Sequence, residues 1–321
     1  MALLAQGLSQ QKFELHLVLV TQTREEIKEE LESGGVPAGV EVYALGERRV
    51  RAGALSILRL VWRLRPGAIL SGIVHLNFLV LLLKPLFPRG TRILVRQNAT
   101  PSSSLVQDHL PPYTRFFYRW LYRRADRIIC QSSAMADDLA QVARLERAEI
   151  AVLPNPLDFE GIRAALGNPS RWAGAGPNLL AVGRLSAEKG FDLLLEAVAE
   201  LRKEFSAVQL TILGSGPLED QLKSQCRALM LENSVYFAGY QKNPYAFYPG
   251  ATLFVLPSRH EGMPNALLEA LAGGLPIVAT PASGGIETLL AGQKFAWVAR
   301  EASSVALAEA LRTALHSLQG N

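Results

Sequence analysis

Short apolar runs alternate with amphipathic helical stretches along almost the whole chain. This alternation is typical of repeated strand–helix–strand units, which build parallel sheets covered by helices. In the first half the predicted strands are Phe13–Val20, Val40–Ala44, Ala68–Val74, Arg92–Val95, Arg127–Cys130 and Glu149–Leu153. In the second half they are Leu179–Val182, Val208–Leu213, Val235–Phe237, Leu253–Leu256, Pro276–Ala279 and Phe295–Val298. The pattern therefore predicts an α/β protein.

The alternation pauses once, over a segment rich in Gly, Pro, Ala and Asn. Because the chain has 321 residues, it is long enough for two hydrophobic cores. We predict a first domain over residues 1–155, a linker over 156–177 and a second domain over 178–321. Each domain is expected to be a doubly wound parallel sheet, and the two sheets are expected to face one another and bind ligands at the carboxyl ends of their strands.

The start of the chain departs from this pattern. In a doubly wound domain the first strand usually lies at the centre of the sheet, and the loop after it contacts the ligand. Here Ala2–Leu8 is predicted to be helical before any strand has occurred. We therefore expect the central first strand of the first domain, with its loop, to be missing.

Basic residues are concentrated in the first half. Residues 1–155 hold 20 Lys and Arg against 14 Asp and Glu, whereas residues 156–321 hold 13 against 15. Between Arg115 and Arg124 the arginines alternate with aromatic residues, which suits an anionic membrane surface or an anionic lipid-linked substrate. A solvated helix face with its aromatic side chains in the core explains the same stretch, and both interpretations stay open. Nucleic acid is not expected as a partner, because no recognition motif accompanies the charge.

The chain reads as a cytoplasmic protein. Its two cysteines, Cys130 and Cys226, lack the spacing of a disulfide framework or a zinc site. The start has no secretory signal, and the longest uninterrupted apolar run of the window Ala68–Phe87 is too short to cross a bilayer. The inner face of the cell membrane is a candidate peripheral location.

Two glycine-containing turns follow predicted strands of the second half. In Gly183–Gly190, Arg184 and Lys189 lie five residues apart, and two such cations can hold a diphosphate between them. In the next turn, Gly214 and Gly216 allow the backbone to approach a ligand closely. An ordinary surface turn also explains either segment taken alone.

The strongest signal is a pair of glutamates after the buried strand Leu253–Leu256. Glu261 lies on the loop, and Glu269 falls inside the helix that Pro264 is expected to begin. A carboxylate on the loop can reach the ligand, while one on the helix can accept two hydrogen bonds from the hydroxyls of a ribose or a sugar. Solvation of the helix explains Glu269 poorly, because its neighbours in the chain are apolar.

Further along, Gly284 and Gly285 are predicted to open a short helix. Backbone N–H groups at a helix N-terminus would stabilise diphosphate charge as a leaving group departs. A plain glycine turn capped by Ser283 explains the same residues.

Taken in order, the segments GRLSAEKG, LGSGP, FAG, FVLPSRHEGMPNALLEALAGGLPIVAT and SGGIE resemble the nucleotide-sugar half of family-4 retaining glycosyltransferases with the GT-B fold. The resemblance is close over residues 179–300 and looser over Ala125–Leu139 and Ile150–Asp158. It implies two facing Rossmann-like domains and transfer of a hexose or N-acetylhexosamine, with retained configuration, from a nucleotide-sugar donor to a glycan or lipid-linked acceptor in polysaccharide biosynthesis. It implies no metal or other cofactor, and a UDP-sugar is favoured over a GDP-sugar.

The resemblance also implies roles for single residues. Arg184 and Lys189 would bind the donor diphosphate, Glu269 the ribose hydroxyls, and Glu261 the transferred sugar. The other donor-binding residues would be Gly183, Gly214 and Gly216 in the two turns, Gly284 and Gly285 by the phosphates, and Tyr240 and Gln241 near the base.

The chain departs from the family pattern in its first domain. Where some members have a histidine, this chain has Gln97 and Asn98, and the nearest histidines are His75 and His109. The glycine-rich loop before the first helix and the closing helix are both expected to be absent, so the chain is expected to be truncated at both ends. An inactive nucleotide-sugar-binding protein and a nucleotide-sugar epimerase therefore stand as alternatives to a transferase.

Overall fold

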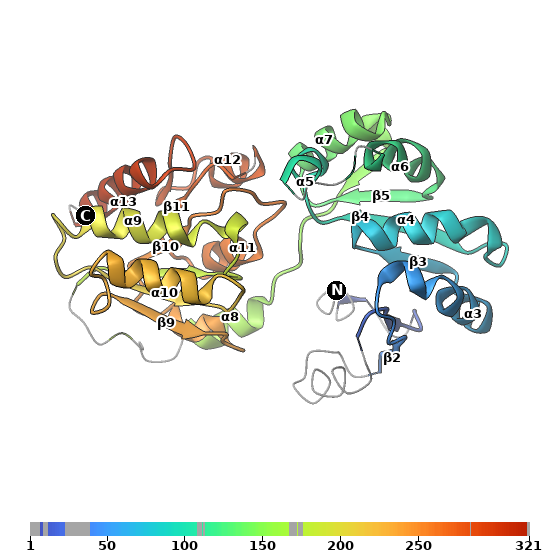
Figure 1. The fold of residues 1–321 in the computed structure, drawn as a ribbon, viewed down its shortest axis with the longest axis horizontal. Coiled ribbons are helices and arrows are strands. Elements are labelled where there is room, and N and C mark those ends of the chain that lie inside the picture. The colour runs from blue at the N-terminus through green and yellow to red at the C-terminus, as the bar shows by residue number, and fades with distance from the viewer. Residues whose placement is uncertain are drawn as a thin grey trace. The chain divides into compact units, whose positions relative to one another are not determined.

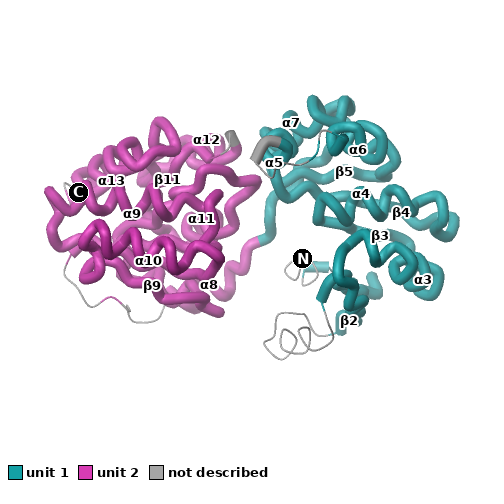
Figure 2. Tube along the Cα trace, in the orientation of Figure 1, with its two compact units in different colours: residues 1–156 teal, residues 157–321 magenta. Residues whose placement is uncertain are grey.

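The computed structural model describes residues 7–8, 12–22, 39–107, 111, 113–166, 172, 176–282 and 284–319. It divides into two compact units, Met1–Pro156 and Leu157–Asn321 (Figures 1 and 2). Every strand pair in both units is parallel, as the alternation of strands and helices predicts. The boundary between the units lies one residue from the predicted end of the first domain.

Unit 2 holds a six-stranded sheet in the order β12-β11-β10-β7-β8-β9. The chain enters at the centre of the sheet, moves outward through β8 and β9, and returns to β10 beside β7 before moving outward the other way. The direction of winding therefore reverses between β7 and β10. The strands are β7 (Asn178–Val182), β8 (Gln209–Leu213), β9 (Val235–Gly239), β10 (Leu253–Leu256), β11 (Ile277–Ala279) and β12 (Ala296–Val298).

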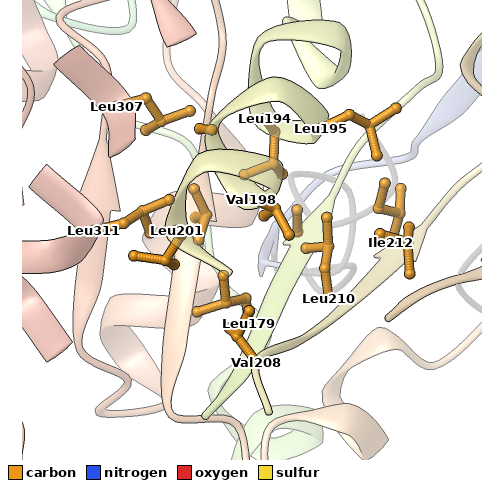
Figure 3. Close-up of a cluster of buried hydrophobic side chains, with 14 of the residues drawn as sticks. Leu179, Leu194, Leu195, Val198, Leu201, Val208, Leu210, Ile212, Leu307 and Leu311 are labelled. Carbon is orange, nitrogen blue, oxygen red and sulfur yellow. The ribbon is translucent and has the colours of Figure 1, made fainter. Parts of the chain in front are cut away.

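Helices cover both faces of this sheet, because successive side chains of a strand point to opposite faces. One core joins β7 and β8 to α9 (Phe191–Leu201), α10 (Glu219–Ala228) and α13 (Ser304–Gln319). Figure 3 shows Leu179 of β7 and Leu210 of β8 in the same cluster as leucines of α9 and α13. The other core joins alternate residues of β10 and β11 to α11 (Asn265–Ala272) and α12 (Gly284–Leu290). All four residues of β10 are buried, and burial of each such apolar side chain contributes roughly 2 kcal/mol.

The described residues of unit 1 form two sheets. The larger has the order β3-β4-β5-β6, with β3 (Ala68–Ser71), β4 (Arg92–Gln97), β5 (Arg127–Cys130) and β6 (Ile150–Val152). Its core lies against α4 (Val74–Leu83), α6 (Thr114–Leu121) and α7 (Ser133–Ala143). The smaller sheet pairs β1 (His16–Leu19) with β2 (Glu41–Ala44). Two further helices of the unit are α3 (Ala54–Leu64) and α5 (Pro101–Gln107).

No strand among the described residues joins the β1–β2 sheet to the β3–β6 sheet. A doubly wound order would place one strand between β1 and β3. The missing central strand stays a prediction, because residues 1–6 and 9–11 lie outside the described part of the chain. Of the predicted helix Ala2–Leu8, only Gly7 and Leu8 are described.

The predicted linker over 156–177 differs from the structure. It contains α8 (Phe159–Leu166), which packs against α11 and a 3-10 turn, η6 (Pro244–Phe247), and belongs to unit 2. The helix forms because Ile162 and Ala165, three residues apart, share one buried face. This helix was not predicted because its apolar stripe is short and the segment is rich in Gly, Pro and Ala.

Candidate functional site

The loops after β7 and β10 flank the point where the direction of winding reverses. Ligands of doubly wound sheets bind at this point, outside the carboxyl ends of the strands. The first loop contains η5 (Ala187–Lys189), and the second contains Glu261. Lys189 Nζ lies 2.7 Å from Glu261 Oε1, and the Ser258 hydroxyl donates a second hydrogen bond to the same oxygen, also over 2.7 Å. Two predicted site residues from separate loops therefore form one ion pair.

The backbone around Glu261 is fixed to the neighbouring strand end. The Glu261 N–H donates to the Ala282 carbonyl oxygen over 3.2 Å, and the Thr280 hydroxyl donates to the Ser258 carbonyl oxygen. The Glu261 side chain is 8% exposed and that of Lys189 is 26% exposed, so solvent screens their charges only in part. The loops after β7, β10 and β11 thus form one connected edge.

The glycine turns are close to one another as well as to this edge. Gly214 has φ +137, and a Cβ there would lie 1.9 Å from the Gly183 carbonyl oxygen. Gly190 has φ +64, and a Cβ there would lie 2.1 Å from the Pro257 carbonyl oxygen. Close packing of neighbouring turns therefore suffices to explain why Gly190 and Gly214 are glycines. The donor-binding role of Gly183, Gly214 and Gly216 stays a prediction.

Glu269 lies on α11, where sequence analysis placed it, in surroundings that sequence analysis missed. Burial raises the pKa of its carboxyl, while a hydrogen bond with the Tyr245 side chain opposes that rise and the nearby Asp158 adds to it. Tyr248 is almost fully buried, its hydroxyl has no hydrogen-bond partner, and the Glu269 carboxylate contributes to the raised pKa of that hydroxyl. In the sequence, the aromatic residues between β9 and β10 were the signal from which these surroundings of Glu269 could have been predicted.

The remaining predicted residues lie on other elements of the two units. Tyr240 is 77% exposed after β9, and the Gln241 side-chain amide donates to the Ala238 carbonyl oxygen of its own strand. Arg184 is exposed on the same turn as Lys189. Gly284 and Gly285 begin α12, as predicted, whereas Ser283 lies outside the described residues. Of the two histidines, His75 is exposed on α4 and His109 is not among the described residues.

A second link between the two loops was not predicted. The Arg259 guanidinium donates to both carboxylate oxygens of Asp192, over 2.7 and 2.6 Å, and to the Ala187 carbonyl oxygen over 2.9 Å. The Arg259 N–H donates to the Glu188 carbonyl oxygen over 2.8 Å. The hydrogen bond from Arg259 also lowers the pKa of Asp192. Arg259 precedes Glu261 by two residues, and its contacts with Ala187 and Glu188 are made to η5, which contains Lys189. The contacts of Arg259 therefore fix the distance between Lys189 and Glu261.

Comparison with known proteins matches both units. Residues 166–319 match the family of glycosyl transferases group 1, and residues 1–160 match glycosyltransferase family 4. The chain belongs to glycosyltransferase family 4. It is 29% identical to an N-acetylgalactosamine-N,N'-diacetylbacillosaminyl-diphospho-undecaprenol 4-alpha-N-acetylgalactosaminyltransferase of Campylobacter jejuni, over 74% of this chain and 64% of the relative. It is 31% identical to a putative colanic acid biosynthesis glycosyltransferase, WcaL, of Escherichia coli, over 70% of this chain and 55% of the relative.

Solved structures show the same fold. Alr3699/HepE of Anabaena in complex with UDP superposes with TM-score 0.71 at 19% identity, over 94% of this chain and 83% of that one. A sucrose-phosphate synthase of Thermosynechococcus elongatus superposes with TM-score 0.73 at 17% identity, over 95% and 90%. The fold is therefore GT-B, with two Rossmann-like domains. The chain spans only 64% and 60% of the length of the first two curated relatives.

Neither a helix that could span a membrane nor a group of metal-ligating side chains occurs in the described part of the chain. No helix there is long and apolar enough to cross a membrane. Likewise, no three His, Cys, Asp or Glu side chains are placed there to hold a metal ion. Transfer without a metal stays a prediction.

Proposed function

We propose that this chain transfers a sugar, with retained configuration, from a nucleotide-sugar to a glycan or lipid-linked acceptor in polysaccharide or glycan biosynthesis. The Lys189–Glu261 pair supports this most directly, because it holds a cation for a diphosphate beside a carboxylate for sugar hydroxyls at the winding reversal. The Anabaena neighbour with bound UDP favours a UDP-sugar donor. The Campylobacter relative, named for a diphospho-undecaprenol substrate, favours a lipid-linked acceptor.

In the proposed reaction, the bond between the anomeric carbon and the donor phosphate oxygen breaks, and a bond to the acceptor oxygen forms on the same face. The acceptor proton passes to the departing phosphate oxygen, so no strong protein base is needed. Lys189 and Arg184 stabilise the leaving diphosphate, with the N–H groups of Gly284 and Gly285 beside it. Glu261 holds the sugar hydroxyls while positive charge develops at the anomeric carbon, and Glu269 holds the ribose.

A turnover screen with UDP-, GDP- and ADP-sugars tests this function. The purified chain is incubated with each donor and a lipid-linked glycan extract, and the products are identified by mass spectrometry. A new glycoside is the expected result. A new epimer of the donor would favour an epimerase, and a bound but unchanged donor would favour a binding protein.

Nucleotide binding is expected to weaken in mild acid. The Glu269 carboxylate must be ionised to accept two hydroxyl hydrogen bonds, and burial raises its pKa above the ordinary value of 4.5. As pH falls, Glu269 is therefore protonated before exposed carboxyls, and UDP affinity falls with it. Calorimetry between about pH 8 and pH 5 checks this. Glu269→Gln should bind UDP weakly at both ends of the range, whereas the exposed-residue control Glu232→Gln should keep the parent profile.

Arg259→Lys is expected to weaken donor binding severalfold. Lysine keeps the charge but cannot donate to both Asp192 oxygens and the Ala187 carbonyl oxygen at once. Because the two side chains are 31% and 36% exposed, the free energy of unfolding should change by less than about 1 kcal/mol. Calorimetry and thermal unfolding measure the two effects. Arg300→Lys is the matched control, since its pairing with Glu309 lies far more exposed; an equal loss of donor affinity there would count against a positioning role.

We also propose that the outer face of α6 contacts an anionic membrane. The structure divides the aromatic residues of this stretch: Tyr118 and Tyr122 are fully buried, whereas Phe116 is 60% and Trp120 42% exposed. The two exposed rings stack with centroids 6.0 Å apart, and the Arg124 guanidinium lies 4.2 Å from the Trp120 centroid. No acidic residue occurs between positions 111 and 125. A stretch of arginines with exposed aromatic rings suits an anionic lipid interface.

Binding to anionic vesicles tests this surface. The parent chain should sediment with phosphatidylglycerol vesicles, less so as salt rises, and much less with phosphatidylcholine alone. Phe116→Ser with Arg123→Gln should weaken vesicle binding about tenfold, at roughly 1 kcal/mol for the arginine. Tyr236→Ser, which removes a ring that is 63% exposed on unit 2, is the control. Equal binding to both lipids would favour a solvated helix face instead.

A further inference from the structure

Polar side chains gather at the carboxyl ends of β4, β5 and β6 in unit 1. Arg96 and Asn98 are two residues apart and so share one face of the sheet. Gln131 follows β5 beside Asn98 and donates its amide to Asn98 Oδ1 over 3.1 Å. Asn155 follows β6 and accepts a hydrogen bond of 2.6 Å from the Arg96 guanidinium. This edge is where parallel sheets bind ligands, and the donor-site residues all lie in unit 2.

Arg96 is a buried cation whose charge is not balanced. The residue is 5% exposed, and among the described residues no carboxylate forms an ion pair with it. Burial lowers the pKa of its guanidinium, and no acidic group opposes that shift. Its Nε is buried without a hydrogen-bond partner. Because an isolated buried charge is costly, a guanidinium in this state suits an anion that arrives from solution.

Gln131 adds a hydrogen-bond acceptor that has no donor in the structure. It is also 5% exposed, and its Oε1 is buried without a hydrogen-bond partner. Asn98 beside it is exposed, so the cluster reaches the surface of the unit. The site therefore offers a charged donor and a neutral acceptor, which match an anionic oxygen and a hydroxyl.

We propose that this cluster binds the acceptor through a sugar that carries a phosphate. This assignment rests on the proposed function and names the chemistry of its acceptor. Arg96 balances the phosphate charge and donates from Nε to a phosphate oxygen, and Gln131 Oε1 accepts from a sugar hydroxyl. A neutral glycan would leave the guanidinium charge unbalanced, and a bare anion would leave Gln131 Oε1 without a donor.

Calorimetry of the full chain with glucose 1-phosphate, without nucleotide, tests the site. A background with both Lys189→Met and Arg184→Gln removes the two cations of the donor site, so failure of the donor assignment does not affect the result. Arg96→Gln and Gln131→Glu are each expected to weaken glucose 1-phosphate binding at least about tenfold. Arg92→Gln, at the exposed amino end of the same strand, should bind as the background does.

Gln131→Glu also separates binding from structure. Arg96 pairs with Ile129, two residues before Gln131, so position 131 is a diagonal neighbour of Arg96 on the next strand. A carboxylate there would partly balance the guanidinium charge, so thermal stability should hold or rise while binding is lost. If Arg96→Gln does not fold, Gln131→Glu decides. Unchanged binding in Gln131→Glu would overturn the proposal, as would glucose binding as tightly as glucose 1-phosphate. Glucuronate binding in place of the sugar phosphate would overturn the assignment of a phosphate.

Discussion

Replacing Lys189 by methionine is expected to weaken nucleotide-sugar binding about ten- to hundredfold while the fold stays intact. The substitution removes a charge-assisted contact with the diphosphate worth roughly 1.5–3 kcal/mol. It also leaves Glu261, whose side chain is 8% exposed, without the cation 2.7 Å away. Calorimetry with UDP and UDP-glucose measures the loss, which should affect both ligands because both contain the diphosphate.

Glu261→Gln separates the sugar from the nucleotide. Glutamine keeps an oxygen that accepts from the Ser258 hydroxyl but carries no charge. Free UDP should therefore bind nearly as it does to the parent, while UDP-glucose binds more weakly and is transferred slowly. The pair Lys223→Met and Glu219→Gln is the matched control, because that ion pair has a similar length of 2.6 Å on the surface of α10. Unchanged UDP affinity in Lys189→Met would refute the diphosphate role.

Much of the fold was readable from the sequence because parallel strands are buried on both faces. Such strands form continuous apolar runs, and the predicted run Leu253–Leu256 has the same bounds as β10. The winding order places the loops after β7 and β10 side by side, so Lys189 and Glu261 meet although 72 residues separate them. The residues of this site were predicted from their motifs, whereas the ion pair between them required the structure.

Contacts between side chains on separate loops could not be predicted from the sequence. Arg259 and Asp192 are 67 residues apart, and each alone resembles an ordinary solvated charge. The hydroxyl of Tyr245 meets Glu269 only because η6 and α11 lie on the same side of the sheet. Arg96 directly follows the predicted strand Arg92–Val95, where a charged residue is expected to be solvated. Only the structure shows that Arg96 is buried and that no carboxylate forms an ion pair with it among the described residues.

Amide hydrogens of β1 and β2 are expected to exchange at least about a hundredfold faster than those of β10. Neither β1 nor β2 contains a buried residue, and the two form a separate two-stranded sheet, which is marginally stable by itself. β10 is buried along its whole length and pairs with β7 and β11 on its two sides. Its amides should therefore exchange only when unit 2 unfolds.

Hydrogen exchange followed by mass spectrometry compares these strands within one sample, so solution conditions cannot differ between them. β4 is the internal control, because Ile93 and Val95 are fully buried in the larger sheet of the same unit. The amides of β4 should exchange more slowly than those of β1 and β2. This result would show that low stability is confined to the β1–β2 sheet and does not extend to the whole of unit 1. Protection of β1 and β2 equal to that of β10 would mean that the small sheet is part of a larger one in solution, and the expectation of a missing central strand would then be wrong.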